Sequence, residues 1–353
     1  MIISIQDRLV GEDQPTYFIA DIGANHDGDI RRAKQLISLA KQAGADAAKF
    51  QHFKADKIVS DYGFRKMKTL SHQAKWNKSV FETYQDAELN RTWNKELATH
   101  CQKEGIHFFS SPYDFEAVEM LDPYMPAYKI GSGDVNWDEI IILMAKKGKP
   151  VLLATGASDL QEVVHAVETV IKYNKHLVLM QCNTNYTGDM ENFRYINLRV
   201  LQTYRTLFPE VILGLSDHTL GHATVLGAVA LGARVIEKHF TDDNSRVGPD
   251  HAFAMNPHTW REMVERTREL ESALGSPIKR VEQNEEDTVI VQRRCIRVTR
   301  SIPKGQTIKA DDLEVLRPAP LDSFPPNKIS LVVGKKATRN LEAGEHLNWE
   351  AIC

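Results

Sequence analysis

Lysine and serine side chains stand near the ends of several short apolar runs in this sequence. Lys49 and Lys129 occupy such places, as do Ser110, Ser132 and Ser216. Two cations with several hydroxyl donors suit an anionic ligand such as a phosphate or a carboxylate. The alternative is that each lysine forms a structural ion pair with a buried carboxylate. Polar residues at so many apolar run ends favour the ligand, because a buried polar group is costly unless it is paired or used.

Two histidines form a second group with chemical potential. His218 directly follows one apolar run, and His239 lies near the end of the next. Neutral imidazoles on neighbouring strands can share one divalent metal ion, with water or carboxylate oxygens completing its shell. Histidine is an unspecific signal, and the alternative for each is a core residue with satisfied hydrogen bonds.

Eight apolar runs predict the elements that position these residues, because strands buried on both faces are nearly continuously apolar. The runs cover residues 17–23, 47–51, 107–112, 127–132, 151–156, 177–183, 211–217 and 235–240. Amphipathic stretches such as 30–44, and 158–173 with Ser158 as the N-cap, predict helices between them. Eight such units within about 260 residues indicate a (β/α)8 TIM barrel, whose site lies at the carboxyl ends of its strands. A doubly wound open sheet is the alternative, but residues 22–28 lack its glycine-rich phosphate loop.

The remaining segments divide the chain. Residues 64–89 predict an elongated loop after the second strand, on the catalytic face of the barrel. We expect the barrel to span residues 1–275, a charged linker to span 276–290, and a small β domain to span 291–353. Within that domain, residues 302–308 are echoed by 341–347, each with a central glycine whose positive φ allows a tight turn.

Composition narrows the class of protein. The chain has 353 residues, of which 42% are hydrophobic and 26% charged, as expected of a folded protein rather than a disordered one. Lys and Arg number 44 and Asp and Glu 47, a balance that predicts neither a nucleic-acid partner nor a membrane partner. The four cysteines form no Cys-x-x-Cys pair, and residues 1–4 open no signal peptide. We therefore expect a cytoplasmic location.

Several longer motifs, in order along the chain, resemble the sialic acid synthase family, which includes the legionaminic and pseudaminic acid synthases and spore-coat polysaccharide enzymes. These motifs are IADIGANHDG at 19–28, KFQ at 49–51, YKIGSG at 128–133, GLSDHT at 214–219, EKHFT at 237–241 and GPD at 248–250. The resemblance covers nearly the whole chain, and residues 291–353 resemble the antifreeze-like (SAF) domain of that family.

The resemblance implies a reaction. Members join phosphoenolpyruvate to the aldehyde of an open-chain N-acylated amino sugar, with the help of Mn²⁺ or Mg²⁺, and release phosphate and a nine-carbon 3-deoxy-2-ulosonic acid. By matching position, phosphoenolpyruvate would be held by Lys49, Ser110, Lys129, Ser132 and Ser216, and the metal by His218 and His239. Asp21, Asp134 and Asp250 would act near the metal-bound water and the acceptor hydroxyls, Thr184 and Tyr186 would line the acceptor pocket, and Arg317 would reach the acceptor from a second subunit. A homodimer that exchanges its C-terminal domains is therefore expected.

The sequence departs from the family pattern at several of these places. Asp21 and Asp134 stand where glutamate is common, Ala154 where serine is common, and residues 181–188 differ from the usual pattern of the sixth strand. The last difference leaves the acceptor sugar open. Two other functions compete: a pyruvate-dependent aldolase with Lys129 as the Schiff-base lysine, and a non-catalytic sugar-binding or ice-binding protein. The latter needs a regular threonine face, and residues 291–353 contain three threonines.

Overall fold

A computed structural model describes residues 1–67 and 78–353. The chain divides into two compact units, Met1–Gly275 and Ser276–Cys353. The first unit holds the predicted barrel, and the second holds a small β domain. Each unit is described by itself below.

The first unit is built on an eight-stranded parallel sheet in the order β5-β4-β3-β10-β9-β8-β7-β6. Its edge strands, β5 and β6, lie next to each other, so that the sheet forms a nearly closed barrel. The strands are β3 (Tyr17–Asp21), β4 (Ala47–His52), β5 (His107–Pro112), β6 (Tyr128–Ile130), β7 (Val151–Ala154), β8 (Leu177–Cys182), β9 (Ile212–Asp217) and β10 (Ala233–His239). All eight coincide with the predicted runs, and the (β/α)8 class is confirmed.

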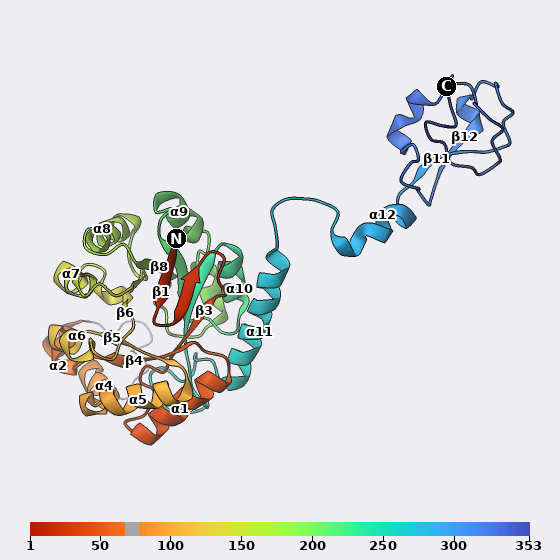
Figure 1. The fold of residues 1–353 in the computed structure, drawn as a ribbon. Coiled ribbons are helices and arrows are strands. Elements are labelled where there is room, and N and C mark those ends of the chain that lie inside the picture. Colours follow the sequence, from red (N-terminus) through yellow and green to blue (C-terminus); the bar gives the residue numbers. More distant parts are fainter. Residues whose placement is uncertain (68–77) are drawn as a thin grey trace. The chain divides into compact units, whose positions relative to one another are not determined.

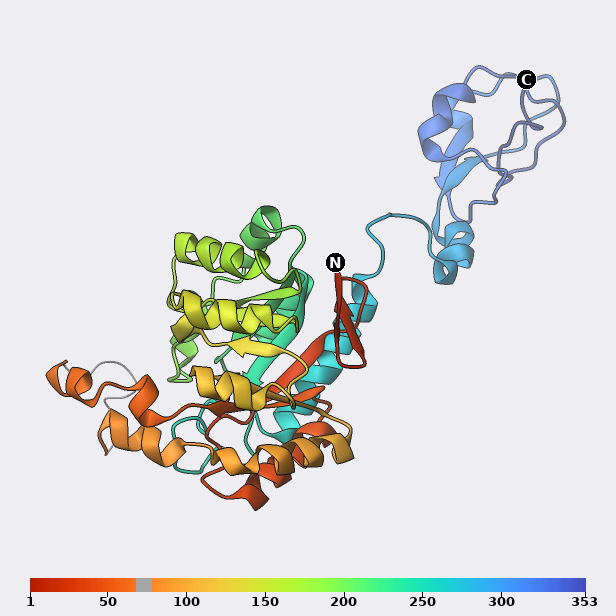
Figure 2. The same ribbon diagram turned by 60° about the vertical axis from the view of Figure 1, so that its left-hand side comes forward.

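Helices surround the strands on the outside (Figures 1 and 2). They are α1 (Ile30–Gln42), α2 (Ala55–Ile58), α3 (Asp61–Lys66), α4 (Val80–Ala87), α5 (Asn94–Glu104), α6 (Phe115–Leu121), α7 (Asp138–Lys146), α8 (Leu160–Ile171), α9 (Val200–Leu207), α10 (Ala223–Ala230) and α11 (Pro257–Leu274). Short 3-10 turns are η2 (Arg91–Trp93), η3 (Ser132–Asp134) and η4 (Met190–Tyr195). The prediction that Ser158 caps α8 is wrong, because Asp159 and Glu162 form a reciprocal capping box there.

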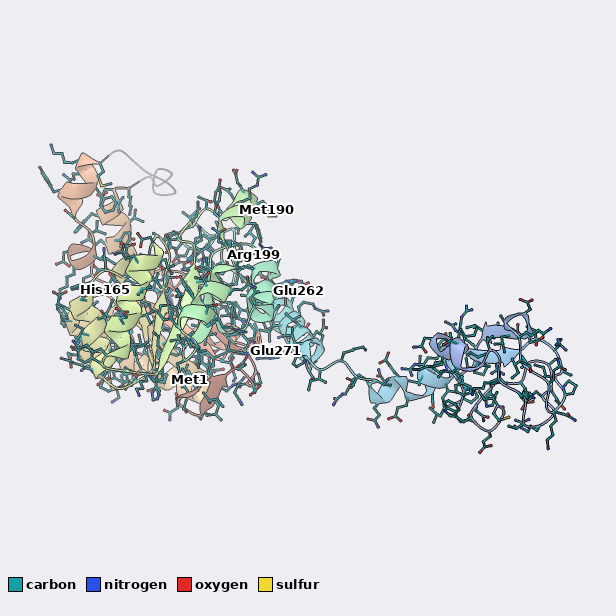
Figure 3. The ribbon with its side chains drawn as sticks, turned by 90° about the horizontal axis from the view of Figure 1, so that it is seen from above. Met1, His165, Met190, Arg199, Glu262 and Glu271 are labelled. Atoms are coloured by element: carbon teal, nitrogen blue, oxygen red, sulfur yellow. The ribbon has the colours of Figure 1, made fainter. Side chains whose placement is uncertain are left out.

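A hairpin that the sequence patterns did not indicate precedes the barrel. Its strands, β1 (Ile2–Ile5) and β2 (Arg8–Gly11), pair antiparallel. Ile3, Ile5 and Val10 are buried in the inner core of the barrel. Figure 3 shows Met1 at one end of the barrel and Met190, which follows β8, at the other. The hairpin therefore closes the amino end and leaves the carboxyl end for a site.

The expected elongated loop at 64–89 is partly helical. α3 ends and α4 lies within this range, and residues 68–77 fall outside the described part of the chain. Ser79 and Glu82 form a capping box at the start of α4. In the described ranges, none of the helices has both the length and the apolar character needed to cross a membrane.

The second unit begins with η5 (Gln283–Glu285) and α12 (Glu286–Gln292), so that part of the expected linker is helical. It continues with β11 (Cys295–Val298), η6 (Ala310–Asp312), β12 (Leu313–Leu316) and η7 (Pro326–Leu331). Ile302 pairs with Leu341, which joins the two echoed segments. Gly305 and Gly344 have φ of 82° and 84°, as their predicted turns require. The domain has its own apolar core.

Candidate active site

A cavity of about 440 Å³ opens at the carboxyl ends of the barrel strands. Ten of the predicted site residues line it: Asp21, Lys49, Lys129, Ser132, Asp134, Tyr186, Ser216, His218, His239 and Asp250. Ser110 and Thr184 are not among its lining residues, and Arg317 belongs to the second unit, where it is exposed. The barrel thus brings together residues that are up to 229 positions apart, from Asp21 to Asp250.

Two buried lysines face two buried carboxylates on the cavity floor. The register of the parallel strands places Asp21 of β3 beside Lys49 of β4, and their Oδ2 and Nζ atoms are 2.6 Å apart. Lys129 Nζ lies 3.4 Å from Glu237 Oε1, and Lys49 Nζ lies 3.9 Å from Glu237 Oε2. The expected alternative, lysine–carboxylate pairing, is therefore present, but in the wall of a cavity.

These pairs fix the charge states of the floor. Burial opposes ionisation of Asp21, but the Lys49 ammonium, His239 and the hydrogen bonds from Lys49 and Gln51 outweigh it, and the pKa of Asp21 is lowered. Burial likewise opposes the charge on Lys49, and Asp21 and Glu237 outweigh it, so the pKa of Lys49 is raised. Both groups are charged at neutral pH. An anionic ligand would therefore meet cations that are already ordered.

Three buried polar atoms of the floor have no hydrogen-bond partner within the described ranges: Ser111 Oγ, Glu237 Oε2 and His239 Nδ1. Their residues all line the cavity. Buried polar groups in folded proteins are nearly always hydrogen-bonded, so each orphan atom requires an explanation. A polar ligand on the cavity floor would supply the missing partners.

Ser110, predicted to hold the ligand, is instead part of the protein core. Its Oγ donates to the carbonyl of Phe50 at 3.0 Å and shares a hydrogen bond of 2.6 Å with His52 Nδ1. The next residue, Ser111, lines the cavity. Successive side chains of a strand point to opposite faces, so a shift of one residue exchanges the core for the site. Ser111 replaces Ser110 as the candidate ligand residue.

Two further residues of the floor were not assigned a role from the sequence, although a signal for them exists. Gln51 donates to Asp21 Oδ2 at 3.0 Å, and Ser216 donates to Glu237 Oε1 at 3.1 Å. Gln51 lies two positions after Lys49, and Glu237 lies two positions before His239. Residues two apart on a strand share a face, so the same periodicity that gives the strands also indicates Gln51 and Glu237.

The two histidines lie together at the ends of β9 and β10, with ring centroids 5.5 Å apart. His218 Nδ1 lies 2.8 Å from the carbonyl oxygen of Asn183, which only accepts hydrogen bonds. The proton therefore sits on Nδ1, and in the neutral ring Nε2 keeps its lone pair. A backbone carbonyl that orients a metal-binding imidazole in this way is a common outer-shell contact.

Carboxylates flank the second imidazole. His239 Nε2 lies 3.7 Å from Asp21 Oδ2, and His239 Nδ1 lies 3.6 Å from Asp250 Oδ2. In the described part of the chain, no group of three or more His, Cys, Asp or Glu side chains is arranged to hold a metal ion. Two neighbouring imidazoles nevertheless fit an open metal site, in which water or substrate oxygens occupy the other positions.

Asp134 differs from the other carboxylates, because only the charge of Lys129 opposes the effect of burial on its pKa. Burial raises the pKa of Asp134 to about 6. It lies in η3, directly after β6, and lines the cavity. A carboxyl group with this pKa can both give and take a proton near neutral pH, which suits general acid–base catalysis.

A parallel barrel with buried lysines, two neighbouring imidazoles and a titrating carboxyl at its carboxyl end would suit an enzyme that acts on an anionic substrate. Residues 36–279 match the model of the NeuB family, and residues 293–352 match that of the SAF domain. The chain belongs to the NeuB family of sialic acid synthases and related enzymes, as its motifs predicted.

Relatives span almost the whole chain. The N,N'-diacetyllegionaminic acid synthase of Legionella pneumophila is 36% identical over 97% of this chain and 96% of that protein. The N-acetylneuraminate-9-phosphate synthase of Mus musculus is 34% identical over 98% and 95%. The crystal structure of the spore coat polysaccharide biosynthesis protein SpsE from Bacillus subtilis matches with a TM-score of 0.66 and 30% identity, over 100% and 99% of the two chains. Both the barrel and the second domain are therefore shared.

Proposed function

We propose that the protein condenses phosphoenolpyruvate with the aldehyde of an open-chain N-acylated amino sugar, to give a nine-carbon 3-deoxy-2-ulosonic acid and phosphate. The cavity floor carries the proposal, because it places two buried lysines, three orphan polar atoms and two imidazoles together. The names of the relatives, which are synthases of N,N'-diacetyllegionaminic acid and of N-acetylneuraminate 9-phosphate, support it.

The floor binds phosphoenolpyruvate through its charges and hydroxyls. Lys49 and Lys129 face its phosphate and carboxylate, and Ser111, Ser132 and Ser216 donate hydrogen bonds to the same groups. Ser111 Oγ gains the partner that it lacks. Fixing both anionic groups orients C3 of phosphoenolpyruvate toward the aldehyde, and such positioning lowers the barrier by removing motional freedom before the reaction.

His218 and His239 would hold the divalent metal, Mn²⁺ or Mg²⁺. The ion supplies Lewis-acid polarisation of the aldehyde oxygen when bound. The protein positions both rings: the carbonyl of Asn183 fixes His218. Asp250 stands beside His239 and is itself held by the backbone N–H of Ala24, at 3.2 Å.

The carboxyl groups move the protons. The π electron pair of the C2=C3 bond of phosphoenolpyruvate forms the bond from C3 to the aldehyde carbon, and water bonds to C2. The C2–O bond to phosphate then breaks as the new C2 hydroxyl becomes a ketone, and the proton of that hydroxyl leaves with the phosphate. Asp134, with its pKa of about 6, donates a proton to the oxygen of the former aldehyde. Asp21 stays ionised because Lys49 and Gln51 hold its carboxylate. It therefore orients the water and accepts a proton as that water attacks C2.

Phosphate release from phosphoenolpyruvate tests the proposal. We expect release only when Mn²⁺ and an N-acyl amino sugar are both present, and a product whose mass equals the two substrates plus water minus phosphoric acid. An aldolase would instead consume pyruvate without releasing phosphate, and borohydride would trap pyruvate on Lys129. Consumption of pyruvate, or no phosphate release with any amino sugar, would refute the proposed reaction.

The second unit completes the site in this proposal. Arg317 is exposed and would reach the acyl group of the acceptor from a second copy of the chain. An Arg317→Ala protomer mixed with a protomer that carries His218→Ala and His239→Ala would then regain activity, because one site of the heterodimer is intact. Absence of rescue after proven subunit exchange would show that each chain builds its own site.

A further inference from the structure

Asp250 reaches the cavity from the loop that joins β10 to α11. Its Oδ2 atom accepts a hydrogen bond from the backbone N–H of Ala24 at 3.2 Å and lies 3.6 Å from His239 Nδ1, which is one of the orphan atoms. Gly23 leaves the space for this carboxylate, because a Cβ atom there would lie 2.8 Å from Oδ2. The position of Asp250 therefore depends on how the loop after β10 lies against the loop after β3, which supplies Gly23 and Ala24.

The next residue, His251, faces away from the cavity and connects these two loops. Its side chain is fully buried and is not among those that line the cavity. Its Nε2 atom lies 3.0 Å from Asp27 Oδ1, and its Nδ1 atom lies 2.7 Å from the hydroxyl oxygen of Thr241. A carboxylate only accepts hydrogen bonds, so the ring carries its proton on Nε2, and in the neutral ring Nδ1 accepts from Thr241. One imidazole thus joins the loop after β3 to the loop after β10.

Arg32 of α1 connects the same two loops a second time. Its Nε atom lies 3.0 Å from Asp27 Oδ2, and its Nη1 and Nη2 atoms donate to the two carboxylate oxygens of Asp242 at 3.0 and 2.5 Å. Asp27 is therefore held at both of its oxygens, by His251 at one and by Arg32 at the other. These four residues, Asp27, Arg32, Asp242 and His251, are called the loop clamp here.

The loop clamp has no part in the reaction proposed above, yet it removes charged groups from water. The side chains of Arg32 and Asp242 are 10% and 14% exposed. Burying such groups costs free energy that a well-packed apolar contact would not cost. Paired, directional hydrogen bonds do, however, fix one relative position of the two loops, because their geometry is specific. The loop clamp is therefore best explained by what it holds in place.

We infer that His251 is a positioning residue, which acts through Asp250 to hold His239 in the orientation that binds the metal. The inference rests on the proposed function, which assigns the metal to His218 and His239. A metal-binding imidazole is commonly oriented by a contact of its other ring nitrogen with a carboxylate or a carbonyl. Asp250 is placed to do for His239 what a backbone carbonyl does for the other imidazole. The 3.6 Å separation is just beyond hydrogen-bond distance, so a small movement of the loop decides whether the contact forms.

Binding of Mn²⁺ tests this inference without turnover. The EPR signal of free Mn²⁺, titrated with the full-length protein in the absence of substrates, gives the dissociation constant. We expect His251→Ala and Asp250→Asn each to raise that constant about 10-fold, as the loss of an outer-shell partner does. A variant with both substitutions should bind Mn²⁺ no more weakly than Asp250→Asn alone, because residues that act through one contact are not additive. Unchanged affinity in either single variant, or additive losses in the double variant, would overturn the inference.

His52→Ala is the matched control for a merely structural effect. His52 is as buried as His251, contacts Ser110 Oγ and Asn94 Oδ1 at 2.6 Å each, and does not line the cavity. Both alanine variants should lower the unfolding temperature, but His52→Ala should leave the affinity for Mn²⁺ unchanged. An equal loss of Mn²⁺ affinity in the two would contradict the inference. If His251→Ala does not fold, Thr241→Val, which keeps the shape of the side chain and removes the hydroxyl, takes its place in every comparison.

Failure of this inference can be distinguished from failure of the proposed reaction. A native protein that binds Mn²⁺ but releases no phosphate with any amino sugar would overturn the proposed reaction alone. A native protein that binds no Mn²⁺ would overturn the positioning role, whatever its activity.

Discussion

Lys129 gives the sharpest test of the charged floor. Its side chain is 4% exposed, and its ammonium contacts Glu237 Oε1 at 3.4 Å and the carbonyl of Ile130 at 3.3 Å. Lys129→Met keeps the length of the side chain and removes its charge. The variant therefore separates the role of the ammonium from that of the methylene packing.

The geometry bounds the size of the effect. At an effective dielectric constant of about 20, unit charges at the 3.4 Å separation of Lys129 and Glu237 attract by roughly 5 kcal/mol. When a phosphate binds, Lys129 would exchange its contact with Glu237 for a contact with the phosphate. Only part of this attraction energy therefore appears in the free energy of binding. Removing one partner of a buried charge pair costs about 2–4 kcal/mol, which corresponds to a loss of roughly 30- to 700-fold in kcat/KM for phosphoenolpyruvate.

The assay is phosphate release at varied phosphoenolpyruvate, with thermal unfolding measured in parallel. Lys238→Met is the matched control, since Lys238 is equally buried and contacts Asp217 at 2.5 Å but does not line the cavity. Both variants should lower the unfolding temperature, because each leaves a carboxylate less well paired. The KM for phosphoenolpyruvate should rise in Lys129→Met alone. An unchanged kcat/KM in a folded Lys129→Met protein would mean that the lysine is purely structural.

Three further outcomes are expected. EDTA should abolish phosphate release and Mn²⁺ should restore it, and full activity of a variant with His218→Ala and His239→Ala would disprove the metal site. Because burial raises the pKa of Asp134 from 3.8 to about 6, the folded state holds its proton more tightly, and its ionisation costs stability as pH rises through that interval. The Asp134→Asn variant should therefore melt at a higher temperature than the native protein at pH 7, and this difference should vanish below about pH 4. The same substitution should remove an inflection near pH 6 from the pH profile of kcat/KM; an inflection that persists would belong to another group. Ser111→Ala should raise the KM for phosphoenolpyruvate with little change in unfolding temperature, whereas Ser110→Ala should lower the unfolding temperature with little change in KM; the reverse result would restore Ser110 as the ligand residue.

The barrel could be predicted from the sequence because its strands are buried on both faces. Burial on both sides makes each strand a nearly unbroken apolar run, and the helices between them keep an amphipathic period. The same runs end in the residues that line the cavity, such as Lys49 and His239. Parallel barrels gather all strand ends on one face, so the order of residues along the chain predicted that most of these residues would meet.

Tertiary structure decided what strand periodicity alone leaves open. Two consecutive serines, 110 and 111, end one strand, and only the packing of His52 against Ser110 shows which of them faces the cavity. The hairpin at residues 2–11 has a local pattern too short to indicate that it would close the amino end of the barrel.

Packing between distant segments also decided the electrostatics and the shape of the site. Glu237 contacts both Lys49 and Lys129 because the closing of the sheet brings β10, β4 and β6 around one centre. Likewise, Phe53 and Tyr84 share one wall because α4 packs against the segment after β4. Residue types and their period in the chain thus specify the barrel and its reactive groups. The ion-pair partners of these groups, their charge states and the shape of the pocket arise from contacts between strands and helices. No local pattern encodes those contacts, because they depend on how the whole sheet closes.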